Sequence, residues 1–252
     1  MNYIKVLIRA LLAPWIVIKN LILYYYGHYA TSKFSCTSSL KKKGYYFFNE
    51  KLDIQSLNVL RYEFDRLLEL NELSSFGQNN GRILIEDHLN IEIRNLVVFF
   101  REKAKDYFKL SFVDTEIIYF QKSKKELEEN NVPGGVFHLD DNKKNLKFFV
   151  YLDDVSVKNG PFKYVENSHG PFSFEKIYRW FFWELTLSRK FLYSSSKRKF
   201  ESTVSIIGPA GSMFCADTTG FHKAEKIEEG TRKVFVVSFA ETRFDPYSFL
   251  KK

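Results

Sequence analysis

The chain has 252 residues, of which 45% are hydrophobic, including 26 Phe and 15 Tyr. This composition excludes an intrinsically disordered protein, and the length suffices for one domain with a sizeable core. The formal net charge of +8 favours anionic partners, but no zinc-finger, helix-turn-helix or RNA-binding motif accompanies it, so no nucleic acid is expected to bind.

Residues 1–26 are strongly apolar, with charges at Lys5, Arg9 and Lys19. No charge-free run among them reaches the roughly 20 residues of a membrane-spanning helix, and Arg9 lies too deep for a signal peptide. On a helical wheel the polar residues gather in one arc. This pattern is typical of a helix lying at a membrane interface, or of one packed on the protein's own core or against a second copy. Pro14 should kink this helix or split it in two.

Two amphipathic helices are expected before residue 110. Residues 31–43, rich in Ser, Thr and Lys, are predicted to form a linker, and residues 44–48 a short strand. Asp53 can cap the first helix, and residues 90–109 fit the second. The predicted buried faces are Ile54, Leu57, Leu60, Phe64, Leu67 and Leu68 in the first helix, and Ile91, Ile93, Leu96, Val97, Phe100, Ala104 and Tyr107 in the second.

The second half of the chain alternates apolar and polar residues in short runs, which predicts a β-sandwich or barrel. A segment at 171–201, rich in aromatic and basic residues, interrupts these runs. It is expected to be a helical insertion that packs on the barrel, or else a substrate lid or a second membrane contact. We therefore expect an N-terminal segment, 1–30, and a single domain, 31–252. The predicted strands are 116–121, 145–152, 162–165, 202–207, 212–215 and 233–239.

Three residues with metal-binding side chains suggest a metal centre. His138 and Asp140 are two positions apart, so on an extended segment both can face one ion. His222, which follows a turn after an apolar strand, is the best third candidate. Two histidines and one carboxylate leave three coordination positions open, which is the facial triad of non-haem Fe(II) oxygenases.

Arg232 begins the last strong strand and shares a face with Val234 and Val236. If that face is the interior, the guanidinium needs an anion, and it suits a carboxylate such as that of 2-oxoglutarate. Tyr119 and Gln121 share a face of another strand and could hydrogen-bond the same ligand. The competing interpretation is a surface hydrogen bond between the first histidine and the aspartate, with Arg232 in a surface ion pair.

Several segments between residues 44 and 240 occur in a characteristic order. They are residues 44–48 followed by a helix, then His138-Leu139-Asp140, then residues 149–155 and 159–169, then residues 208–222 and Arg232. Together they resemble the phytanoyl-CoA dioxygenase-like branch of the Fe(II)/2-oxoglutarate oxygenases. The run 159–169 is similar to the family's N-G-x-L-x-x-x-P-G-S-H turn, except that Glu166-Asn167 replaces Pro-Gly.

The resemblance implies an α+β, β-rich double-stranded β-helix, or jelly roll, with N-terminal supporting helices. It implies Fe(II) held by His138, Asp140 and His222, with 2-oxoglutarate and O2 as co-substrates and succinate and CO2 as products. Related halogenases lack the carboxylate ligand, so Asp140 favours hydroxylation of a C–H bond. His169 matches a turn motif and is expected to be structural, and Cys215 is expected in the core.

The substrate is not named by the sequence. The basic and aromatic periphery favours an anionic small molecule, a lipid-linked compound or a saccharide precursor. We expect a cytoplasmic protein, or one peripheral on the inner face of the membrane through residues 1–26. Two rival functions are a catalytically silent barrel tethered at a membrane, and a metal-dependent enzyme that uses the triad without 2-oxoglutarate.

Overall fold

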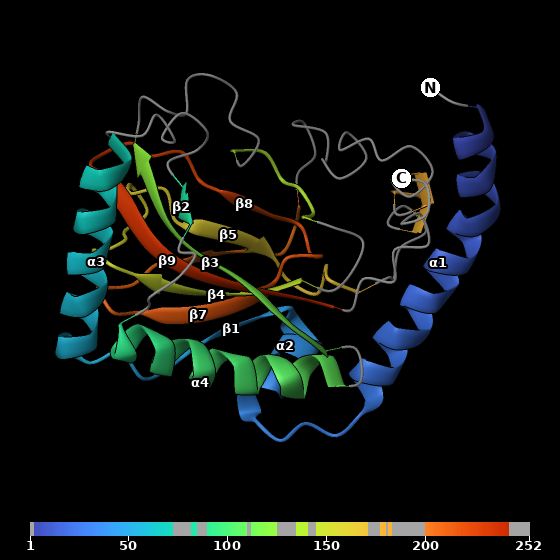
Figure 1. The fold of residues 1–252 in the computed structure, drawn as a ribbon, viewed down its shortest axis with the longest axis horizontal. Helices are drawn as coiled ribbons and strands as arrows, with labels where there is room; N and C mark the ends of the chain where they lie inside the picture. Colours follow the sequence, from blue (N-terminus) through green and yellow to red (C-terminus); the bar gives the residue numbers. More distant parts are fainter. Residues whose placement is uncertain are drawn as a thin grey trace.

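The computed structural model contains two antiparallel sheets with helices packed beside them, and it describes residues 3–72, 82–84, 90–109, 112–124, 135–140, 145–170, 177–179, 181–182 and 200–241 (Figure 1). One sheet has the order β1-β7-β4-β9-β3-β2 and the other β6-β5-β8. This confirms the expected β-rich α+β chain. The strands are β1 (Tyr45–Phe47), β2 (Arg82–Leu84), β3 (Phe112–Lys124), β4 (Asn145–Tyr151), β5 (Phe162–Val165), β6 (Thr203–Ile206), β7 (Met213–Asp217), β8 (His222–Ala224) and β9 (Thr231–Glu241).

The six-stranded sheet is apolar on both faces, and successive side chains on its strands point to opposite faces. On β4, Leu146 and Phe148 belong to the core shared with the helices, while Phe149 and Tyr151 belong to a second core. That second core also contains Tyr164 of β5, in the three-stranded sheet. The two sheets therefore face each other across a packed aromatic layer.

Helices α3 (Ile54–Glu72) and α4 (Ile91–Phe108) cover the other face of the large sheet (Figure 1). Asp53 Oδ1 accepts a hydrogen bond from the Ser56 N–H at 2.9 Å, as expected of a helix cap. The predicted buried faces are buried or, at Leu67 and Leu68, partly buried, and the exceptions are Ile54 and Ile91, which are 67% and 58% exposed. Each is the first residue of its helix, and helical side chains lean towards the N-terminus, so both project beyond the packed surface.

The linker predicted at 31–43 is wrong, because Ser35–Lys43 forms a helix, α2. Asp106 of α4 accepts hydrogen bonds from the backbone N–H groups of Lys33 and Phe34, at 2.9 Å and 3.1 Å. Gly44 ends the helix with φ 86° and donates its N–H to the Leu40 carbonyl. A tertiary anchor distant in sequence therefore stabilises a segment whose composition alone indicates a linker.

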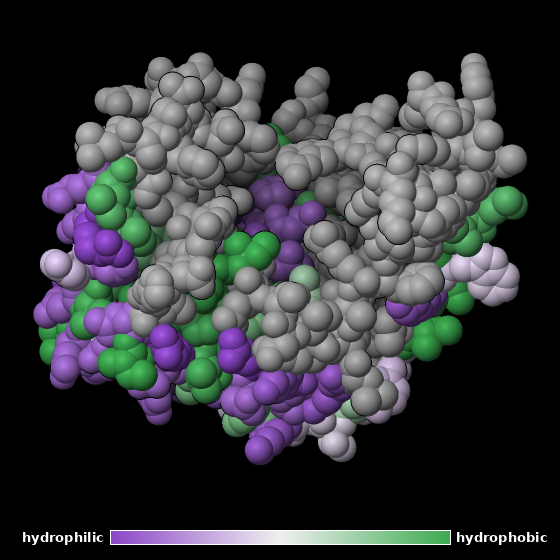
Figure 2. Space-filling model, in the orientation of Figure 1, coloured by the Kyte–Doolittle hydropathy of each residue, from purple (hydrophilic) through white to green (hydrophobic). Residues whose placement is uncertain are grey.

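Helix α1 (Tyr3–Tyr29) runs through Pro14 as one element, bent rather than split (Figure 1). Ala13, Ile16 and Val17 are buried. The opposite side is exposed and apolar, and Figure 2 shows hydrophobic residues along this edge of the molecule. None of the described helices is both long enough and apolar enough to cross a bilayer. The exposed apolar residues are Leu11, Trp15, Ile18, Ile22, Tyr25, Tyr26 and Tyr29.

Most of the predicted insertion at 171–201 lies outside the described residues. Within it, residues 177–179 and 181–182 are helical. Phe221, the residue before β8, packs with Phe200 at the far end of the insertion, and the two ring centroids lie 5.1 Å apart. The Arg179 guanidinium lies over the Phe221 ring at 5.9 Å. The described parts of the insertion therefore contact the small sheet through aromatic side chains.

Candidate metal centre

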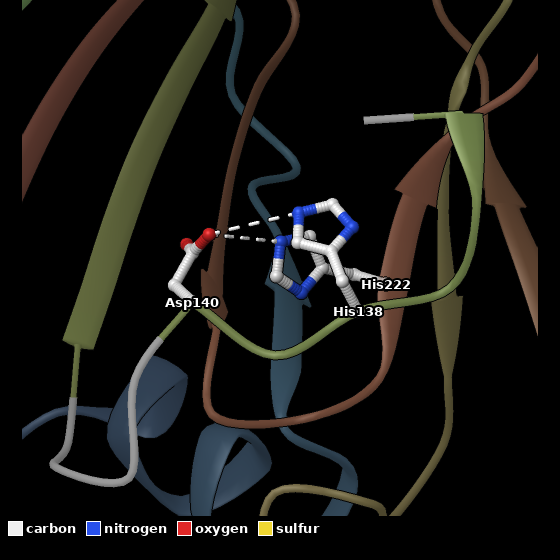
Figure 3. Close-up of side chains that lie close together, drawn as sticks. All are labelled: His138, Asp140 and His222. Atoms are coloured by element: carbon white, nitrogen blue, oxygen red, sulfur yellow. Dashed lines mark ion pairs between the residues drawn. The ribbon is translucent and has the colours of Figure 1, made fainter. Parts of the chain in front are cut away.

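Backbone pairing holds the segment 138–140 beside β8 and the turn that precedes it. The N–H of His138 donates to the carbonyl of His222 at 3.0 Å, and the N–H of His222 donates back at 3.1 Å. The Asp140 N–H donates to the Thr218 carbonyl at 3.0 Å. The chain thus brings His222 into one group with His138 and Asp140, although His222 lies 82 positions after Asp140 in the sequence (Figure 3).

Both imidazoles are oriented by the same local hydrogen bond. Nδ1 of His138 lies 2.9 Å from the Val136 carbonyl, and Nδ1 of His222 lies 2.9 Å from the Gly220 carbonyl. A carbonyl only accepts, so each Nδ1 carries a proton, and Nε2 is the nitrogen that each ring turns towards Asp140. Both Nε2 atoms lie 3.7 Å from Oδ1 of Asp140, too far for a direct hydrogen bond (Figure 3).

The ionisation states of this group suit metal binding. Burial, with the neighbouring His222, lowers the pKa of His138 from 6.5 to about 4, so this ring is neutral at physiological pH. Burial acts to raise the pKa of Asp140, but the Lys147 ammonium and the two imidazoles outweigh it and hold this pKa well below its usual value. Neutral imidazole and ionised carboxylate are the forms that bind metal.

Lys147 is a member of the site that the sequence reasoning missed. It lies on β4, and its Nζ is 2.6 Å from Oδ2 of Asp140. Only 13% of its side chain is exposed. A signal was present in the sequence: Lys147 is two residues before Phe149 and four before Tyr151, so it shares their inward face on an otherwise apolar strand.

A cavity of about 90 Å³ lies between the sheets at these residues. A single water needs roughly 10–15 Å³, so several waters or a small organic acid can occupy it. Among the described residues lining it, the charged ones are Asp140, Lys147 and Arg232. The lining residues are Tyr119, Gln121, His138, Asp140, Lys147, Phe149, Tyr151, Phe162, Phe214, His222, Ala224, Arg232, Val234 and Val236.

Arg232 is 5% exposed, which rules out the interpretation of a surface ion pair. Its Nη2 donates to Oγ of Ser123 on the neighbouring strand β3 at 3.2 Å. The register of β3 and β9 pairs Ser123 with Arg232, Gln121 with Val234, and Tyr119 with Val236. Tyr119 and Gln121, predicted on one face of β3, and Arg232, predicted on one face of β9, therefore line the same cavity as the two histidines and Asp140.

His169 is not part of this group. It is 1% exposed, and its Nε2 lies 3.2 Å from the Lys41 carbonyl. Its own carbonyl oxygen lies 3.2 Å from Oγ1 of Thr219. The residue thus ties α2 to the turn before β8, in keeping with the structural role expected for it. Cys215 is buried in the core, also as expected.

The side chain of Asp217 stabilises the turn before β8 through buried hydrogen bonds. Tyr107 of α4 donates to its Oδ2 at 2.6 Å, and both the N–H and the hydroxyl of Thr219 donate to its Oδ1, at 2.9 Å and 2.6 Å. The turn carries the carbonyls of Thr218 and Gly220, which contact Asp140 and His222. A buried hydrogen-bond network therefore supports two of the three candidate ligands.

No family model and no curated protein matches the sequence. Solved structures do match. HygX from Streptomyces hygroscopicus, crystallised with nickel and 2-oxoglutarate, is 14% identical over 85% of this chain and 89% of its own, with a TM-score of 0.55. SnoN, a non-haem α-ketoglutarate-dependent epimerase from nogalamycin biosynthesis, is 17% identical over 86% and 87%, with a TM-score of 0.51.

A third similar structure is SnoK, a non-haem α-ketoglutarate-dependent carbocyclase from the same biosynthesis. It is 15% identical over 89% of this chain and 92% of its own, with a TM-score of 0.50. Identities this low show a shared fold. They do not show a shared reaction, and the carbocyclase SnoK and the epimerase SnoN themselves differ in activity.

Proposed function

We propose that this protein is a non-haem Fe(II)/2-oxoglutarate-dependent oxygenase with His138, Asp140 and His222 as the iron ligands. One observation carries this proposal: the Nε2 atoms of two imidazoles and one carboxylate oxygen converge in a cavity that also contains a buried guanidinium. That donor set fits a divalent iron and leaves one side of the metal open. HygX, which shares the fold, has been crystallised with iron and with 2-oxoglutarate, and this adds support.

Arg232 is the proposed partner of the distal carboxylate of 2-oxoglutarate, with Tyr119 and Gln121 as further hydrogen-bonding groups. The described lining residues carry two cations and one carboxylate, so the cavity favours an anion before any metal binds. Phe149, Phe162 and Phe214 form apolar walls that limit the water around the reacting groups. Bound iron and 2-oxoglutarate would supply O2 activation for substrate oxidation, with release of succinate and CO2.

Within this superfamily we place the chain in the phytanoyl-CoA dioxygenase-like branch, with the jelly-roll arrangement of its two sheets. The ordered motifs from residue 44 to Arg232 support that placement. We propose hydroxylation of a C–H bond as the reaction, because Asp140 occupies the position where halogenases keep room for a halide. The substrate we propose is an anionic small molecule, lipid-linked compound or saccharide, in keeping with the net charge of +8.

An anaerobic titration tests the metal and co-substrate sites. Purified protein is mixed with Fe(II) and 2-oxoglutarate, and the visible charge-transfer band of the chelate is recorded for wild type, His222→Ala and Arg232→Met. We expect a band that is lost in His222→Ala. In Arg232→Met the affinity for 2-oxoglutarate should fall by at least about 2 kcal/mol, roughly thirtyfold, because a buried charge partner is removed. Folded wild-type protein that gives no band contradicts the proposal.

The two rival functions make different predictions in one further assay. A silent binding barrel releases no succinate from 2-oxoglutarate under any condition. A metal-dependent enzyme without 2-oxoglutarate would turn over substrate when this acid is omitted. Neither rival requires a buried arginine at the position of Arg232, which is why the oxygenase is favoured.

We also propose that α1 contacts the inner face of a membrane through its exposed apolar side. Trp15 and Ile22 are 68% and 63% exposed there, and three Tyr residues follow. Trp and Tyr suit the depth of lipid headgroups, and large exposed apolar patches mark interaction sites. Sedimentation with anionic vesicles should fall strongly in the double variant Trp15→Ser, Ile22→Ser. Unchanged sedimentation of the variant contradicts the membrane contact, and dimers of wild type that this variant dissociates would assign the face to a second copy.

A further inference from the structure

Lys147 is a charged residue on the interior face of an apolar strand. Its neighbours Leu146 and Phe148 point into the core beneath the helices, while Phe149 and Tyr151 share its own face and line the cavity. An ammonium largely removed from water is costly unless a counter-charge accompanies it. The counter-charge is Asp140, whose Oδ2 lies 2.6 Å from Nζ.

The two oxygens of Asp140 have different neighbours. Oδ1 is 3.7 Å from the Nε2 atoms of both His138 and His222, whereas Oδ2 faces Lys147. Of the described residues, only Lys147 brings an ammonium or guanidinium into an ion pair with this carboxylate. The hydrogen bond from the Asp140 N–H to the Thr218 carbonyl fixes the main chain of Asp140 but not the direction of its carboxylate.

We infer that Lys147 is a positioning residue that holds Asp140 as a one-oxygen ligand and thereby keeps the site open and positive for a dianionic co-substrate. A carboxylate can bind a metal through one oxygen or two. With Oδ2 held by the ammonium, only Oδ1 is presented to the metal, and the positions needed by a chelating acid stay open. This inference rests on the proposed metal centre.

The charge of Lys147 acts in the same direction. A divalent metal and Asp140 would together carry a net charge of +1, and Lys147 would raise the net charge of the group to +2. Loss of the ammonium should therefore weaken the binding of a dianionic acid for two reasons: a positive charge is removed, and a coordination position is closed. The loss should not weaken the binding of the metal itself, because it removes a positive charge that repels the metal ion.

The test separates these two affinities in the absence of turnover. Co(II) binding to the metal-free protein, and then 2-oxoglutarate binding to the Co(II) protein, are measured by visible absorption for wild type, Lys147→Met and Lys147→Arg. Lys163→Met is the matched control, because Lys163 is also partly buried and ion-paired, with Glu225 at 3.0 Å, but lies outside the cavity lining. Thermal unfolding confirms that each variant is folded.

We expect Lys147→Met to bind Co(II) at least as tightly as wild type and 2-oxoglutarate about 10- to 100-fold more weakly. Lys147→Arg should restore most of the second affinity, and Lys163→Met should change neither. Parallel loss of both affinities in Lys147→Met would make the role merely structural, and an affinity for 2-oxoglutarate within threefold of wild type would also overturn the inference. Wild-type Co(II) protein that binds no 2-oxoglutarate would instead refute the proposed function.

Discussion

The substitution Tyr107→Phe removes one hydroxyl and leaves the shape of the side chain almost unchanged. Tyr107 and Asp217 are both buried, at 1% and 0% exposure, and the hydroxyl donates to Oδ2 of Asp217 at 2.6 Å. Thr219 supplies the two donors to Oδ1, so the change takes away the donor to Oδ2. Leaving a buried carboxyl oxygen without its hydrogen-bond donor lowers the free energy of unfolding by about 1–3 kcal/mol.

We expect the free energy of unfolding to fall by about 2 kcal/mol, measured by urea denaturation. For a chain of this size the midpoint of thermal unfolding should then fall by roughly 4–8 °C. Tyr62→Phe is the matched control, since Tyr62 is 70% exposed and the same chemical change there should stay within about 0.5 kcal/mol of wild type. A Tyr107→Phe variant as stable as this control would refute the view that the buried bond to Asp217 supports the fold.

Two further outcomes follow from the site and its surroundings. The pKa of His138 is about 4 in the folded protein and 6.5 when exposed, so the unfolded state takes up the proton first as the pH falls. Metal-free protein should therefore lose about 2 kcal/mol of stability from this group between pH 7.5 and pH 5, and urea titrations of His138→Gln should show a smaller loss. Gly44 and Gly230 both have positive φ, at 86° and 70°, but a Cβ at Gly44 would lie 2.3 Å from the Tyr164 hydroxyl, whereas at Gly230 the nearest atom is 3.4 Å away. Gly230→Ala should cost about 1–2 kcal/mol from backbone strain, and Gly44→Ala roughly 3 kcal/mol or more, so equal thermal shifts would show that the contact has no effect.

The repeat of apolar residues along the sequence predicted those helices and strands that bury an apolar face of their own. On β4, alternate residues face two different cores, and this strand was recognised within one residue. β2 and β8 were missed because each is three residues long, too short for a period of two to be visible, and neither has the aromatic run that indicated the equally short β1. Helix α2 was missed because its start is held by Asp106, more than 70 positions away.

The candidate ligands could be predicted because few side-chain types bind iron and their spacing matched an extended segment. Lys147 could not be recognised by type, since a lysine on a strand is most often exposed, and only its register with Phe149 indicates the interior. The Glu166-Asn167 departure from the Pro-Gly turn also becomes clear only in three dimensions. Asn167 has φ 56°, a conformation that Gly adopts freely and Asn tolerates better than most residues, so the turn is kept.

The site is assembled by backbone pairing rather than by its functional side chains. The bridge between His138 and His222 uses only N–H and C=O groups, and the anchor of Asp140 is likewise a backbone bond to Thr218. In both histidines the ring is then set by the carbonyl two residues earlier, the same local device used twice. Replacing a ligand side chain therefore removes a donor atom while the frame that holds the others stays in place. If such variants lose metal or co-substrate binding, the loss will accordingly report on coordination chemistry and not on the fold.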